Sequence, residues 1–265
     1  MLGKLMKYEW KATWKLLLAA NLLTVVMTFL AAWMVHIMGS SSASNMVDFV
    51  AVMVIITYVG SMFAVYVGTA IYLIHRFYTS TYGDQGYLLH TLPVDTHHII
   101  IAKVLVSAIW VLINTVLIYL SVIFLFASSE DFLVSMMEGM MDAITFLGAE
   151  KISVFTVVMT VIAYLFSLFA RVLKVGACIS LGQLSSNYKL MLSFAWYVGI
   201  YLVERIFQGV YFGLRLAFSR KDSYVSTFSH YYDNQWETTL LAAIISCVVF
   251  YTLTWYVMDR KLNLD

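Results

Sequence analysis

The sequence predicts an all-α membrane protein that crosses the bilayer six times. Hydrophobic residues make up 62% of the 265 residues and charged residues only 12%, whereas soluble domains carry about 25% charged residues. Mean hydropathy is +0.85. The apolar residues gather in runs of about 20 residues or more, the length that a helix needs to cross roughly 30 Å of hydrocarbon. A chain this poor in charge cannot cover a water-facing surface, so its outer surface is expected to face lipid.

The apolar runs define the predicted spans within one transmembrane domain that covers residues 1–265. Several runs exceed the minimum length, which indicates tilt or extension beyond the hydrocarbon. The single proline and the scarcity of polar turn clusters argue against a β-sandwich or a long disordered region. In chain order, the predicted spans cover residues 16–38, 47–74, 99–126, 152–181, 190–218 and 239–258.

The segment before the first span is predicted to be an amphipathic helix. At 100° per residue, four lysines fall on one narrow stripe, and Trp10 and Trp14 lie beside it. One interpretation is an interfacial helix on the anionic cytoplasmic leaflet. The alternative is a simple basic anchor with no other role, and the sequence does not separate the two. The lysines are Lys4, Lys7, Lys11 and Lys15.

The distribution of lysine and arginine predicts the orientation in the membrane. An even number of spans places both ends of the chain on one side. The opposite side would hold Lys151, Arg220 and Lys221, with Arg215 near its edge. This asymmetry predicts that both termini are cytoplasmic. The basic residues on the predicted cytoplasmic side are Lys4, Lys7, Lys11, Lys15, Arg76, Lys103, Lys189, Arg260 and Lys261.

The cytoplasmic connection between the second and third spans, residues 76–98, carries the most informative motif. It contains the only proline and mixes an acid with glycines and large apolar residues, so it is too apolar for a free linker. The string GDQGYLLHTLPVDTHHIIIAKVL resembles the cytoplasmic loop of ABC-2 type transporter permeases from Gram-positive bacteria. That family shows an acid, then G-Y-L, then T-L-P-V, then a lysine that opens the next span. The matching residues are Asp84, Gly86, Tyr87, Leu88, Thr91, Leu92, Pro93, Val94 and Lys103.

Other stretches are also similar to this family. They are the basic N-terminal segment, ISLGQLSSNYKL at residues 179–190, and the closing RKLNLD at residues 260–265. His90, His97 and His98 depart from the pattern. The resemblance implies a transmembrane subunit in a bacterial cytoplasmic membrane. Its implied partners are a separate ABC ATPase, which would hold ATP and Mg²⁺, and a second copy of the chain or a related permease.

The residues support one part of this implication directly. No G-x-x-x-x-G-K-[ST] phosphate-binding loop occurs in the chain, so active transport would need a separate ATPase and the chain itself is expected to hold no cofactor. The 76–98 loop is then the expected docking surface, with apolar anchors and a charged rim. The alternative is that this loop only packs under its own helices. The expected docking residues are Arg76, Asp84, Tyr87, Leu88, Leu92 and Pro93.

Ionisable residues inside the predicted spans are a second candidate site, because a charge in hydrocarbon is costly unless paired or hydrated. Arg171 and Lys174 lie three residues apart in the fourth span, and Glu204 and Arg205 lie near the middle of the fifth. Glu204 is expected to pair with Arg171 or Lys174 and to form a polar patch along a substrate pathway or at a subunit interface. The alternative is snorkelling to the cytoplasmic interface, which suits Lys174 best.

No catalytic or metal-binding arrangement is predicted. The six histidines are scattered, the two cysteines (Cys178 and Cys247) lie in separate apolar runs, and the net charge of +1 gives no reason to expect nucleic acid. The external segment 128–151 combines methionines with acids. It is expected to lie on the outer surface and, through its acids, to favour a cationic substrate such as a peptide; Cu(I) binding is the minor alternative.

The leading hypothesis for function is therefore the permease subunit of an ATP-driven exporter for a peptide or small amphipathic substrate. A self-contained channel or secondary transporter is the first alternative. A membrane enzyme or sensor with no transport role is the second.

Overall fold

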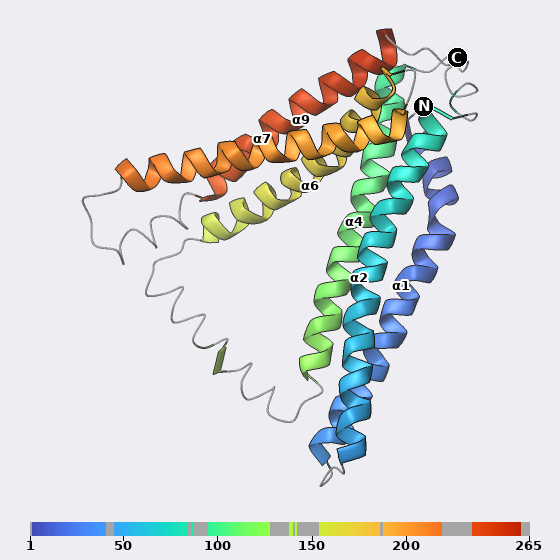
Figure 1. Ribbon diagram of the computed structural model, residues 1–265, viewed down its shortest axis with the longest axis vertical. Coiled ribbons are helices and arrows are strands. Elements are labelled where there is room, and N and C mark those ends of the chain that lie inside the picture. Colours follow the sequence, from blue (N-terminus) through green and yellow to red (C-terminus); the bar gives the residue numbers. More distant parts are fainter. Residues whose placement is uncertain are drawn as a thin grey trace. The chain divides into compact units, whose positions relative to one another are not determined.

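The computed structural model describes residues 2–40, 45–83, 86, 95–127, 138–139, 141, 154–185, 188–218 and 235–260. Within these residues the chain is helical and contains no strand. All six helices are long and apolar enough to cross a membrane, which confirms the predicted all-α fold and makes the chain a multi-pass membrane protein. The helices are α1 (Leu2–Ser40), α2 (Asn45–Thr81), α4 (Thr96–Ala127), α6 (Val154–Gly182), α7 (Lys189–Phe218) and α9 (Gln235–Arg260) (Figure 1).

Helix α1 is uninterrupted from the lysine-bearing segment into the first span. Its first turns are packed on one side, because Trp10 stacks on Trp110 of α4 with ring centroids 4.7 Å apart. The Trp110 indole N–H donates a hydrogen bond to Thr13 Oγ1 at 3.0 Å. One of the two tryptophans near the lysine stripe is therefore partly used in helix packing. The interfacial and simple-anchor interpretations of the stripe both stay predictions.

The chain divides into two compact units, and the first described here comprises residues 3–75 and 106–149. Helices α1, α2 and α4 run side by side in it (Figure 1). Leu17, Leu73, Val106 and Trp110 form its buried apolar cluster. In lipid, burial of apolar side chains contributes little to helix association. Close packing and hydrogen bonds between the helices therefore stabilise the association instead.

Hydroxyl and amide side chains supply such bonds inside the same unit. The Ser121 hydroxyl lies 2.5 Å from the Thr28 hydroxyl and 2.8 Å from the Tyr58 hydroxyl, so it connects α1, α2 and α4. Asn114 Nδ2 donates to Thr69 Oγ1 at 3.1 Å and links α4 to α2. The unit is thus polar at several points of its interior and apolar on its outer surface.

The second unit comprises residues 1–2, 76–105 and 150–265. In it, α6 packs against both α7 and α9. Small residues such as Ala163 and Ala177 are buried along α6, and they allow close approach of neighbouring helices. At one end of the α6–α9 pair, Phe155 meets Trp236 edge to face with centroids 5.7 Å apart.

Gly182 explains how α6 ends against the start of α7. A Cβ atom on this residue would lie 2.7 Å from the Lys189 carbonyl oxygen and 2.8 Å from the Ser193 backbone nitrogen. Only a residue without a side chain therefore allows α7 to begin this close to α6. The connection closes with Tyr188 at φ 60°, in the left-handed region, immediately before α7.

Candidate functional site

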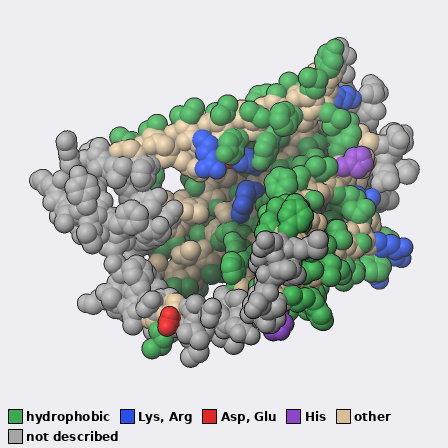
Figure 2. All heavy atoms as spheres, turned by 60° about the horizontal axis from the view of Figure 1, so that its bottom comes forward, with side chains coloured by type: hydrophobic (Ala, Val, Ile, Leu, Met, Phe, Trp, Pro, Cys, Tyr) green, Lys and Arg blue, Asp and Glu red, His purple; other side chains and the backbone are tan. Residues whose placement is uncertain are grey.

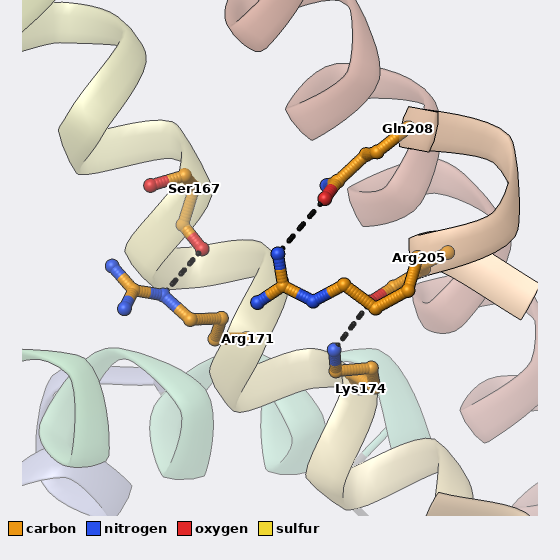
Figure 3. A network of polar contacts seen from close by, with 6 residues as sticks. Ser167, Arg171, Lys174, Arg205 and Gln208 are labelled. Carbon is orange, nitrogen blue, oxygen red and sulfur yellow. Dashed lines mark hydrogen bonds and ion pairs between the residues drawn. The ribbon is translucent and has the colours of Figure 1, made fainter. Parts of the chain in front are cut away.

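An ion pair joins α6 and α7 inside the second unit. The Lys174 ammonium lies 2.7 Å from Glu204 Oε2 (Figure 3). The Lys174 side chain is 9% exposed, whereas the Glu204 side chain is 32% exposed. Of the two partners expected for Glu204, the structure places Lys174 beside it. The Lys174 side chain is thus paired with α7 within the unit.

Of the two partners, Glu204 lies in the middle of α7 by length along the helix, whereas Lys174 lies eight residues before the end of α6 at Gly182. At 1.5 Å per residue, Glu204 is about 22 Å from Lys189 and about 21 Å from Phe218. A charge at such a position is costly in hydrocarbon unless it is paired. The 2.7 Å contact is the arrangement that makes a buried lysine tolerable, because each group supplies the other's counter-charge.

Two arginines flank the ion pair, and their recorded contacts are with uncharged groups. Arg171 Nε donates to the Ser167 carbonyl oxygen at 3.3 Å, and its guanidinium lies 5.7 Å from the centre of the Tyr164 ring. Arg205 Nη1 donates to Gln208 Oε1 at 3.1 Å. Figure 3 shows the Arg205 side chain extending from α7 in the direction of α6.

Each basic side chain of the site also lies near a tyrosine. The Arg205 guanidinium is 4.9 Å from the centre of the Tyr201 ring, and the Lys174 ammonium is 5.5 Å from that of Tyr197. The negative face of an aromatic ring stabilises a cation, typically by about 0.5–2 kcal/mol. The tyrosines therefore offset part of the cost of holding cations here. Sequence reasoning missed the tyrosines, although Tyr201 lies four residues before Arg205 and Tyr164 seven before Arg171, on the same helix faces. Tyr197 comes from a different helix than Lys174, so spacing gives no signal for that contact.

The proposed docking loop is described at its two ends and at Gly86. Arg76 lies in the last turns of α2 and is half-buried, and its carbonyl oxygen accepts a hydrogen bond from Ser80 Oγ at 2.6 Å. The other predicted docking residues lie outside the described residues. They are Asp84, Tyr87, Leu88, Leu92 and Pro93.

Both ends of that loop are anchored within the second unit. Lys103 Nζ of α4 donates to Ser80 Oγ of α2 at 2.5 Å. The Tyr82 hydroxyl lies 2.6 Å from Ser180 Oγ of α6, and burial raises the pKa of the Tyr82 phenol, so it stays protonated. These contacts tie the residues next to the loop to α4 and α6.

Gly176 allows α6 to lie close to the end of α2. A Cβ atom at Gly176 would lie 3.3 Å from Cζ of Phe77, so the ring sits directly over the glycine. Gly176 is two residues after Lys174 along α6. The end of the docking loop and the ion pair are therefore connected through one turn of α6. The run of small residues at 176–178 is the sequence signal for this approach.

Histidines near the start of α4 make local contacts. His97 Nδ1 lies 2.6 Å from the Tyr251 hydroxyl of α9, and the His97 ring stacks on Trp255 with centroids 5.3 Å apart. His98 lies 3.6 Å from Asp95. Among the described residues, no three His, Cys, Asp or Glu side chains gather as a metal site requires.

Comparison of the chain with protein-family models, with curated proteins and with solved structures found no match.

Proposed function

We propose that the chain is the permease subunit of an ATP-driven ABC exporter in a bacterial cytoplasmic membrane. It would form the pathway for a peptide or small amphipathic substrate and couple to a separate ATPase through residues 76–98. The observation that carries this proposal is the loop string GDQGYLLHTLPVDTHH, which resembles the coupling loop of ABC-2 type permeases. Six membrane-spanning helices and the absence of a phosphate-binding loop in the sequence support it.

The contacts at the two ends of the loop support a coupling role. A docking loop transmits motion only if its ends are held to the elements that must move. Here Ser80 and Tyr82 are held to Lys103 and Ser180, and Phe77 packs over Gly176. A displacement of the loop would therefore act on α6 close to Lys174.

The proposal assigns ATP and Mg²⁺ to the partner ATPase and none to this chain. The other partners are the lipid bilayer and a second permease, either a copy of this chain or a related one. The polar cluster Arg171, Lys174, Glu204 and Arg205 is proposed to line or border the pathway, because it contains the charges of α6 and those near the middle of α7.

A double substitution in the docking loop tests the coupling assignment. Replacing Tyr87 and Leu92 with Asp introduces two charges into the proposed apolar anchor, and burying an unpaired charge disfavours association strongly. We expect loss of the ATPase from a detergent pull-down, with membrane insertion unchanged.

The matched control is the pair Tyr87→Phe and Leu92→Met, which keeps an apolar anchor and should retain the ATPase. Full retention by the Asp variant would remove the docking assignment. Recovery of the wild-type chain alone under gentle conditions, with no nucleotide-binding partner, would instead favour a channel or secondary transporter, or a membrane enzyme or sensor.

A further inference from the structure

The charges of α6 and α7 point to a missing anion. Glu204 is the one acidic residue of these two helices, and three cations accompany it away from the helix ends, Arg171, Lys174 and Arg205. Lys174 forms the ion pair with Glu204. The two arginines therefore have no carboxylate partner within α6 and α7.

The single carboxylate is already occupied. Glu204 pairs with Lys174 at 2.7 Å, and the recorded contacts of Arg171 and Arg205 are to a backbone carbonyl, an amide oxygen and two tyrosine rings. A second copy of the chain has the same deficit, because its own Glu204 is paired in the same way. The α6 and α7 helices of this chain and of a copy therefore supply no second carboxylate for the two arginines.

Basic side chains are also exposed on the surface without described acidic neighbours. Figure 2 shows a group of Lys and Arg side chains on one face with no described acidic side chain visible beside it. Both arginines are exposed on the chain. An uncompensated guanidinium at the middle of a span is unfavourable, and neutral contacts offset only part of that cost. An anion bound from outside the chain would supply the rest.

The chemistry of the donors indicates which anion. A guanidinium has five N–H donors in a planar fork that matches the oxygens of a phosphate or carboxylate. Arg171 and Arg205 each spend one donor in a recorded hydrogen bond, which leaves the others for a ligand. The neighbouring surface is apolar and exposed at Val161 and Tyr164 of α6 and at Leu202 of α7. The ligand must then carry an apolar chain beside its charged group.

We infer that Arg171 and Arg205 bind the anionic phosphate or carboxylate group of an amphipathic molecule at mid-length of α6 and α7. This binding does not require the ATPase, but its use in transport rests on the proposed function. The site then selects an anionic amphiphile as cargo or holds an anionic lipid. The acids of the external segment had instead favoured a cationic substrate.

Thermal melting of the purified chain in a neutral maltoside detergent tests the inference. The probes are dodecyl phosphate and phosphatidylglycerol, with dodecylphosphocholine and phosphatidylcholine as zwitterionic counterparts. We expect the two anionic probes to raise the melting temperature in a saturable way and the zwitterionic ones to have little effect. A wild-type chain that shows no preference for the anionic headgroup would overturn the site, whatever the variants do.

The variants Arg171→Gln and Arg205→Gln locate the site. Because a hydrogen bond to a charged group contributes about 1.5–3 kcal/mol, each change should weaken anionic binding by about tenfold or more. Lys189→Gln, which removes a cation from the end of α7, is the matched control and should bind as wild type. Equal losses in Lys189→Gln and the arginine variants would show non-specific charge attraction and overturn the assignment.

Two further measurements separate the source of the ligand. Phosphatidylglycerol that remains on the chain through purification, and is lost in the double Arg→Gln variant, identifies a resident lipid. Binding of dodecyl phosphate to a chain without retained lipid identifies a site open to cargo. Since no ATPase is present in either measurement, loss of this site leaves the proposed function standing, and loss of ATPase association leaves the site standing.

Discussion

At Glu204 a partly exposed carboxylate faces a lysine that is almost fully buried. Lys174 depends on its partner charge more than Glu204 does, because Glu204 is partly exposed and Lys174 is almost fully buried. Removing the carboxylate would leave the Lys174 ammonium buried without a counter-charge. The single residue with the largest effect on this part of the fold is therefore expected to be Glu204.

The substitution Glu204→Gln should destabilise the chain by about 2 kcal/mol, less than for a fully buried pair because the carboxylate is partly exposed. The added change Lys174→Met should recover most of that loss, since no unpaired charge then remains. Equilibrium unfolding in mixed micelles with added dodecyl sulfate measures both. Costs that simply add in the double variant would contradict a coupled pair.

At the scale of the elements, the end of α6 and the start of α7 are held close by the absence of one side chain. The backbone atoms around Gly182 cannot yield as a flexible side chain would, because they belong to the first turn of α7. The close approach sets where α7 begins relative to α6. It thereby sets which residues of α7 reach Lys174.

Gly182→Ala should therefore destabilise the chain by about 1–3 kcal/mol, the usual cost of overpacking. Gly199→Ala is the matched control in α7, because nothing lies within 4 Å of its added Cβ atom. That change should be neutral or stabilising by up to about 1 kcal/mol, since Ala is the better helix former. Thermal melting of the two purified variants gives the comparison, and equal stability would mean that α7 can shift at little cost.

At the scale of the whole molecule, a series of contacts connects the proposed docking loop to the ion pair. Phe77, at the start of the loop, packs on Gly176, which lies two residues after Lys174 in α6. Under the proposed function, this link carries motion from the ATPase to the membrane site. It is a packing contact, so a larger side chain should disturb it without touching the docking surface.

Gly176→Leu should displace the Phe77 ring, because even a Cβ atom would lie 3.3 Å from it. We expect the ATPase to stay associated while its activity falls to the level of the ATPase alone. The control Gly60→Leu adds the same side chain where nothing lies within 4 Å, and it should leave activity unchanged. Full coupling in the Gly176→Leu variant would rule out this contact as the route.

The sequence predicted the six membrane-spanning helices because lipid imposes both their length and their composition. It also narrowed the predicted partner of Glu204 to two basic residues, because spacing along a helix determines the face on which each residue lies. Spacing does not say which helix that face meets. Contacts between helices could therefore be found only in the structure. They are the contact of Phe77 with Gly176, the approach of α7 to Gly182 and the hydroxyl contacts of Ser121.

The hydroxyl contacts around Ser121 have a consequence for biogenesis. The machinery that inserts a helix responds to its hydropathy, and each of α1, α2 and α4 is apolar enough to enter the bilayer separately. The bonds from Ser121 to Thr28 and Tyr58 form only after all three helices have arrived. Loss of the Ser121 hydroxyl would therefore leave a chain that is correctly targeted and inserted but incompletely assembled. Such a chain is expected to be degraded by membrane quality control.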